Sequence, residues 1–190
     1  MKNILSVFAG VLFIVGFIPY IRAILKRESK PSKASWIIWA SLDTIILAGM
    51  IAEHSVNGQI IGAVIGAWTV AFLAMKYGTP GWTKLDKFCL SSMILGIMFW
   101  KIFSNPVLGI VISSSVIFIG AVPTFISTWH DSNRENRTAW TIAWLSCVMT
   151  VIAIPFPLTL ANTLQPATFF VVESVMMYLL YIRRAKRCGI

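Results

Sequence analysis

Long apolar runs recur along the whole chain, and they constrain its fold more than any other feature. Inside a bilayer every backbone N–H and C=O must be bonded within the protein, so an apolar run of about 20 residues crosses as an α-helix. The sequence therefore predicts an all-α, polytopic membrane protein with seven transmembrane helices, of which the fourth is the shortest. The expected spans are 4–25, 35–51, 58–75, 88–103, 107–128, 138–154 and 158–182.

Composition agrees with this class, because 57% of the residues are hydrophobic and only 12% are charged. The net charge is nevertheless +9, and the basic residues lie in or beside the links between the apolar runs. Anionic lipid headgroups attract basic segments that flank transmembrane helices. We therefore expect the lipid bilayer, and not a nucleic acid, as the partner of these residues.

The basic residues also predict the orientation, because Lys and Arg in short loops stay on the cytoplasmic side during insertion. Only Lys2 and Lys101 fall outside the regions that follow the first, third and fifth spans and the last one. These regions are therefore expected in the cytoplasm. The prediction is a protein of the inner or plasma membrane of the cell, with its N-terminus outside and its C-terminus in the cytoplasm.

No sequence pattern predicts an enzyme. Cys89, Cys147 and Cys188 are odd in number and lack metal-ligand spacing, so neither a disulfide framework nor a metal site is expected. His54 and His130 are predicted on opposite faces of the membrane and cannot share a site. The sequence contains no phosphate-binding glycine loop, nucleophile elbow or zinc-protease helix. We expect no catalytic residue, no cofactor and no metal.

Two stretches of the chain resemble each other. Gly16, Pro19 and Trp36 recur as Gly120, Pro123 and Trp140, with a basic loop between proline and tryptophan in each copy and a constant offset of 104 residues. A membrane protein built from two parallel halves shows this kind of repeat. We predict a first three-helix repeat at 1–78, a linker helix at 79–104, and a second three-helix repeat with a basic tail at 105–190. The linker helix lets two halves of odd span number lie parallel.

A proline near the end of the first helix of each half, a basic loop and the three-one-three plan resemble the SWEET and PQ-loop (MtN3-like) superfamily. The family's Pro-Gln signature reads Pro19-Tyr20 and Pro123-Thr124 here, so it is degenerate. The resemblance covers nearly the whole chain. It implies a transporter that moves a small-molecule solute by alternating access between the two halves, by facilitated diffusion or with proton coupling.

Two acids are predicted near the bilayer midplane. Asp43 lies ten residues after Lys33 and Glu173 ten residues before Arg183, so each is about 15 Å from the cytoplasmic boundary. An ionisable group at that depth costs roughly 2.5–3.5 kcal/mol and should face the bundle interior. We predict that both acids bind the solute and couple transport to protons. A protonated carboxyl that only bonds a neighbouring helix is the alternative.

Four further residues complete the predicted solute site. Trp39 shares a helix face with Asp43, and Trp144 is its partial counterpart in the second half, where aromatic faces can hold a flat or cationic solute. Thr69 occupies the position that matches Glu173. SWEET transporters carry an asparagine in the third helix of each half, and the matching positions here are near Gly62 and Pro166. Asn162, about one helical turn nearer the outside, is the binding residue that we predict from this resemblance.

Gly16, Pro19, Gly120 and Pro123 are the predicted hinges. An internal proline removes one backbone hydrogen bond and kinks its helix, and a glycine three residues earlier eases the same bend. A static kink that only shapes packing is the alternative. A second function also stays open, because the chain resembles the KDEL receptor branch of the same superfamily, and a receptor would bind its ligand without moving it. The solute and a homo-oligomeric state are left open.

Overall fold

The computed structural model describes residues 2–132 and 135–183. The prediction of an all-α protein with seven helices is confirmed, since the described residues contain no sheet. The elements are α1 (Lys2–Leu25), α2 (Lys33–Ala52), α3 (Gly58–Tyr77), α4 (Lys84–Phe103), α5 (Pro106–His130), α6 (Arg137–Ala153), α7 (Leu160–Met177) and the π-helical segment η2 (Tyr178–Arg183).

Polar caps set where the helices begin. The side chains of Ser32, Asn57, Thr83, Asn136 and Thr159 each accept a hydrogen bond from a backbone N–H in the first turn that follows. The largest departure from the predicted spans is at α4, which starts at position 84 and not at 88. A capping box between Thr83 and the third residue of α4 extends this helix beyond its apolar run.

Five helices are long and apolar enough to cross a membrane by length and composition: α1, α2, α3, α5, and α7 together with η2. The other two fall short for different reasons. α6 has only 17 residues, and α4 has Lys84, Asp86 and Lys87 in its first turn and Lys101 near its end. The coarse prediction of several transmembrane helices is therefore supported for most of the chain.

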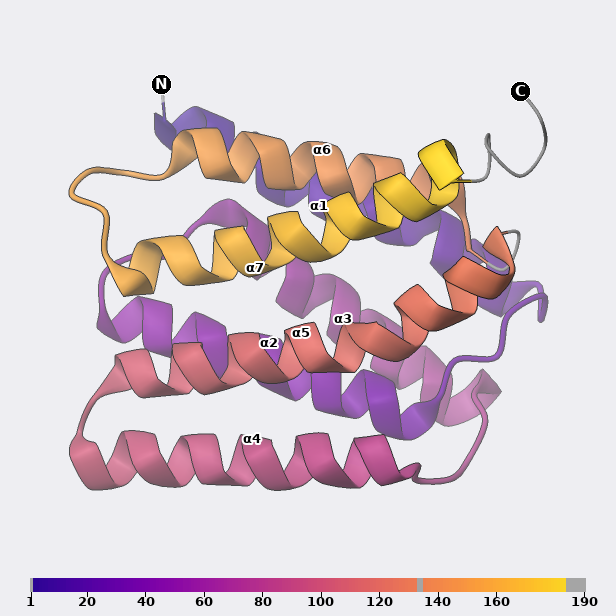
Figure 1. The fold of residues 1–190 in the computed structure, drawn as a ribbon, viewed down its shortest axis with the longest axis horizontal. Helices are drawn as coiled ribbons and strands as arrows, with labels where there is room; N and C mark the ends of the chain where they lie inside the picture. The colour runs from indigo at the N-terminus through magenta and orange to yellow at the C-terminus, as the bar shows by residue number, and fades with distance from the viewer. Residues whose placement is uncertain (1, 133–134, 184–190) are drawn as a thin grey trace.

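The helices alternate in direction (Figure 1). α1, α3, α5 and α7 run one way and α2, α4 and α6 run the other, so the described chain begins and ends at opposite ends of the bundle. We call the end formed by the 26–32 and 78–83 links, the end of α5 and the start of α6 the basic end. The distal end is formed by the N-terminus and the 53–57, 104–105 and 154–159 links.

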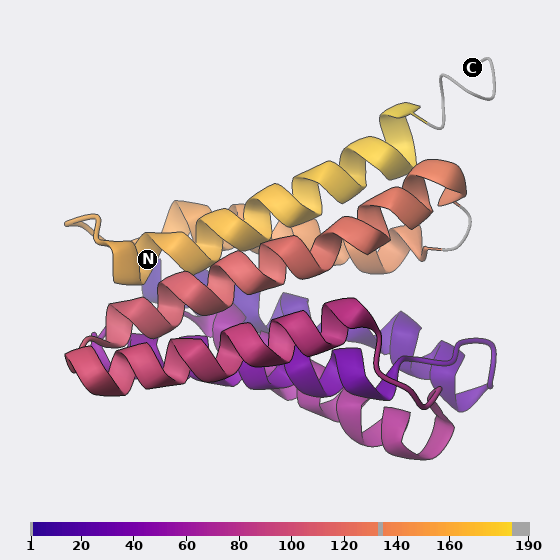
Figure 2. The ribbon, with the colours of Figure 1, turned by 60° about the horizontal axis from the view of Figure 1, so that its bottom comes forward.

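Helix packing repeats between the two parts of the chain. α1 packs on α3 and on α6, and correspondingly α5 packs on α7 and on α2. The α2–α3 contact likewise corresponds to the α6–α7 contact. Exchanging α1 with α5, α2 with α6 and α3 with α7 thus reproduces the main contacts. α4 has no counterpart and lies along α5, with a smaller contact to α2 (Figure 2).

Two glycines lie at corresponding helix crossings. A Cβ added at Gly16 would lie 3.5–3.6 Å from α6, at Ala139, Ile142 and Ala143. A Cβ added at Gly120 would lie 3.2 Å from the Trp39 indole nitrogen on α2. Trp39 is the residue 104 positions before Ala143, so the α1–α6 and α5–α2 crossings use corresponding positions.

A central apolar cluster joins the two parts of the bundle. Its buried members come from α1, α2, α3, α5, α6 and α7, and we call them the central cluster: Phe13, Ile46, Met50, Ile60, Ala63, Ile110, Cys147, Ala161 and Phe169. The ring of Phe13 stacks on that of Phe169 with centroids 5.8 Å apart. The interior is therefore filled across the line where the two parts meet.

Candidate functional site

The two predicted acids are buried at a similar level of the bundle. Asp43 on α2 is 7% exposed and Glu173 on α7 is 8% exposed. Asp43 lies three residues before Ile46, and Glu173 lies four residues after Phe169, both of which belong to the central cluster. Because α2 and α7 run in opposite directions, each acid lies about one helical turn from the central cluster toward the basic end.

Neither carboxyl has a hydrogen-bond partner among the described residues. The Oε2 atom of Glu173 is buried and unpaired. Cys147 of α6 packs in the same central cluster as Phe169, which lies one turn before Glu173 on α7. Burying a carboxylate without a partner is costly. Asp43 and Glu173 are thus buried acids whose carboxyl groups form no hydrogen bond that stabilises the fold.

Trp39 lies in the half of α2 that is nearer the basic end, where α2 crosses α5. Its ring meets that of Trp36 in a T-shaped contact with centroids 5.4 Å apart. It also lines a small cavity of about 30 Å³, together with Ser35 and Cys89. This cavity lies between α2, α4 and α5. Trp39 lies four residues before Asp43 on the same face of α2, and its ring packs against Gly120.

Trp144 packs against α7. Its Nε1–H donates to the Ser174 hydroxyl over 3.0 Å, and its ring stacks on Phe170 with centroids 6.5 Å apart. Ser174 is the neighbour of Glu173 in the chain. Trp144 thus lies near the acid-bearing turn of α7, with its indole N–H already bonded.

The structure does not bring Thr69 and Asn162 to the acids. Thr69 is exposed on α3 and donates to the Ile65 carbonyl of its own helix over 2.7 Å. The preceding residue, Trp68, donates to Thr44 of α2 and so faces inward. Successive helical residues differ by about 100° in direction, which turns Thr69 outward. The position that matches Glu173 by offset therefore does not match it in space.

Asn162 is buried but has a structural role at the start of α7. Its Oδ1 accepts from the Thr159 backbone N–H over 2.9 Å, and its Nδ2 donates to the Pro157 carbonyl over 3.0 Å. These bonds complete a capping box. Its amide groups are therefore committed to the distal end of α7, about three turns from Glu173.

A buried polar network that the sequence analysis did not anticipate lies toward the distal end. Gln165 Nε2 donates to Gln59 Oε1 over 3.1 Å, and Asn57 Nδ2 donates to Gln165 Oε1 over 2.8 Å. Gln59 Nε2 donates to the Ser146 hydroxyl over 3.3 Å and to the Cys147 thiol over 3.1 Å. Gln59, Gln165 and Ser146 are fully buried. The sequence did contain a signal for this network, because Gln59 and Gln165 are polar side chains inside predicted transmembrane spans.

The predicted hinge residues occupy continuous helices. Pro19 lies inside α1 and Pro123 inside α5, and Gly16 and Gly120 lie at the two corresponding crossings described above. Figures 1 and 2 show that α5 bends in its second half, where Gly120 and Pro123 lie. A bend is expected there, and a moving hinge stays a prediction.

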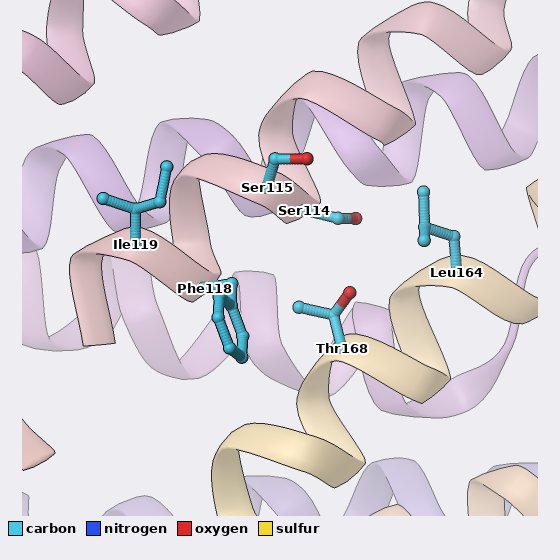
Figure 3. A pocket seen from close by; sticks show the side chains of 6 residues that line it. All are labelled: Ser114, Ser115, Phe118, Ile119, Leu164 and Thr168. Carbon is cyan, nitrogen blue, oxygen red and sulfur yellow. The ribbon is translucent and has the colours of Figure 1, made fainter. Parts of the chain in front are cut away.

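A lateral groove of about 340 Å³ lies between α5 and α7 (Figure 3). It is lined mainly by apolar groups, and the buried Ser114 hydroxyl beside it has no partner. The position that corresponds to Ser114 is Gly10, where α1 and α3 meet backbone to backbone. A serine at this position keeps α5 and α7 from the backbone-to-backbone approach that Gly10 allows between α1 and α3.

Two acids outside the membrane-spanning segments have shifted pKa values. Burial alone would raise the pKa of Asp86, but hydrogen bonds from Thr83 and Ser35 together lower it. Burial raises the pKa of Glu135, which accepts from the Trp140 indole over 2.9 Å. Within the described ranges, no three His, Cys, Asp or Glu residues are grouped to hold a metal ion.

No family model matches this chain, and comparisons with curated proteins and with solved structures likewise give no match.

Proposed function

We propose that the chain is a seven-span membrane transporter that moves a small solute by alternating access between two three-helix halves. The repeated helix packing supports two related halves, α1–α3 and α5–α7 with η2, joined by α4. The corresponding positions of Gly16 and Gly120 at the two crossings support the same division. This arrangement agrees with the plan of the SWEET and PQ-loop superfamily that the sequence resembles.

The proposal requires α4 and α6 to cross the membrane as well. The 17 residues of α6 rise about 26 Å, close to the hydrocarbon thickness of about 27–30 Å. The charged residues of α4 lie within one turn of its ends, where lysine side chains reach the interface by snorkelling. We place the basic end in the cytoplasm, because the described links and helix ends there carry many Lys and Arg residues, among them Lys26, Arg27, Lys30, Lys84 and Lys87.

The observation that carries the function is the pair of buried acids without partners. Ionisable residues inside membrane helices usually lie on solute or proton pathways, because their cost of insertion is retained only for a function. Asp43 belongs to one proposed half and Glu173 to the other. When the halves rock, each carboxyl can gain a proton from one side and release it to the other. We assign solute binding and proton coupling to these two residues.

The test begins with the solute. Detergent-purified protein is heated in the presence of sugars, amino acids, amines and nucleosides at pH 5.5 and 7.5, since a ligand of the folded state raises the unfolding midpoint. Flux of the stabilising compound is then measured in proteoliposomes with and without a pH gradient. Binding without flux would contradict transport and favour the receptor.

Matched variants test the acids. Asp43→Asn and Glu173→Gln keep the side-chain size and remove the ionisable proton, so we expect each to lose the dependence of flux on the pH gradient. Glu53→Gln is the control, because Glu53 is exposed beyond the distal end of α2. Unchanged pH-dependent flux in the double variant would rule out proton coupling through these acids.

A further inference from the structure

Hydrogen bonds between the two proposed halves concentrate at the distal end. Leaving aside the 129–136 segment, every described hydrogen bond between residues 2–78 and 105–183 lies in the distal half of the bundle. Lys2 donates to the Ile154 carbonyl over 2.7 Å, and Ser55 donates to the Ala161 carbonyl over 3.2 Å. The buried amide network lies just below them.

The amide network crosses between the halves several times. Gln59 of α3 bonds Gln165 of α7 and the Ser146–Cys147 pair of α6. Ser146 in turn donates to the Ala9 carbonyl of α1 over 2.7 Å. Helices α1 and α3 of the first half are thus hydrogen-bonded to the second half through the fully buried side chains of Ser146 and Gln59. We call Asn57, Gln59, Ser146 and Gln165 the distal clasp.

The contacts nearer the basic end are of another kind. A Cβ added at Gly16 of α1 would lie at ordinary van der Waals distance from α6, and Gly120 of α5 faces the Trp39 ring. Apolar contacts of this type slide without leaving a polar group unpaired. The distal clasp cannot separate in that way, because each buried carboxamide must exchange its partner for another one.

We propose that the distal clasp, centred on the Gln59–Gln165 pair, is the gate that seals the distal end of the solute pathway. The inference rests on the proposed function. When the halves part at the distal end, the released carboxamides face the opening and need new partners. Carboxamides both donate and accept, so they suit water and a neutral solute that carries hydroxyl or amide groups.

Cys147 provides a direct reporter of this gate. Its thiol is fully buried beneath the distal clasp, and replacing Cys89 and Cys188 by serine leaves it as the single cysteine. A membrane-impermeant maleimide is applied to the distal side of reconstituted protein, and the rate of Cys147 labelling is measured. The assay needs no transport, so its result is separate from that of the flux assay.

Gln165→Leu removes the central bonds of the clasp without touching Cys147. We expect Cys147 to be labelled at least tenfold faster in this variant. Thr168→Val, about one turn along the same helix and outside the clasp, is the control and should label at the parent rate. Asn57→Ser removes the bond to Gln165 and retains a residue that can cap α3 in place of the Asn57 oxygen. It should give a smaller increase, which keeps the test available if the Gln165 variant does not fold.

Two outcomes would overturn the gate. One is a folded Gln165→Leu or Asn57→Ser protein whose Cys147 is labelled no faster than in the parent. The other is an equal increase in Thr168→Val, which would mean that any change in α7 loosens the bundle. Faster labelling without flux would retain the distal clasp as a closure and reject the transport function.

Discussion

Gly62 and Gly16 offer a matched pair of substitutions that tests how the helices meet. A Cβ added at Gly62 of α3 would lie 2.5 Å from the carbonyl oxygen of Gly10 on α1, a backbone atom that cannot turn aside. A Cβ added at Gly16 would lie 3.5 Å from its nearest neighbour on α6, which is ordinary contact. Gly62→Ala should therefore push α1 and α3 apart, whereas Gly16→Ala should fit.

The magnitude follows from comparing the two variants. Each replaces glycine by alanine inside a helix and gains about 0.8–1 kcal/mol of helix propensity, which cancels in the comparison. Forcing an extra methyl group into a packed contact costs roughly 1–3 kcal/mol. The free energy of unfolding of Gly62→Ala should thus be lower than that of Gly16→Ala by about 1–3 kcal/mol.

Unfolding by SDS in mixed micelles, followed by the fluorescence of the eight tryptophans, measures this difference. Circular dichroism of each variant before the titration verifies that the helix content is unchanged. Equal unfolding free energies, or a Gly62→Ala protein that is the more stable of the two, would refute the inference that α1 and α3 meet backbone to backbone.

Three further outcomes are expected. Ser146→Ala should lower the unfolding free energy by about 1 kcal/mol in the same titration, because its hydroxyl links three helices; Ser115→Ala, whose hydroxyl bonds only its own helix, should change it far less. Trp144→Phe keeps an aromatic ring and loses one interhelical bond, so it should cost about 0.6–1.7 kcal/mol. Because the pKa of Asp86 is lowered in the folded protein, its contribution to stability is complete above a pH of about 4 and is lost as the pH falls through the lowered pKa. Asp86→Asn should therefore flatten the acid side of a plot of thermal midpoint against pH.

The helices could be predicted because hydrophobic runs determine them almost alone. Their ends could not, because capping depends on single polar residues such as Thr83 that lie outside the apolar runs. The start of α4 shows the consequence, since the helix includes the charged turn that hydropathy excludes. Burial of Asp43 and Glu173 agrees with the prediction from the cost of inserting a charge.

The polar site was harder to anticipate for a geometric reason. An offset of 104 residues aligns Thr69 with Glu173, but a rotation of one residue on a helix turns a side chain by about 100° and removes it from the interior. The distal clasp joins residues of α3, α6 and α7, which are far apart in the chain, and bonds the backbone of α1. A single sequence shows that Gln59 and Gln165 are polar residues in apolar spans, but not that they bond each other.

Cys147 joins the two proposed parts of the pathway. Its thiol accepts a hydrogen bond from Gln59, and its side chain packs in the central cluster with Phe169, one turn before Glu173 on α7. A proton gained or lost at Glu173 therefore changes the electric field at an atom bonded to the distal clasp, in an interior where such interactions are strong. In the proposed transporter, coupling between proton binding at Glu173 and opening of the gate can then pass through this one side chain, which bonds the distal clasp and packs with the residue one turn before Glu173.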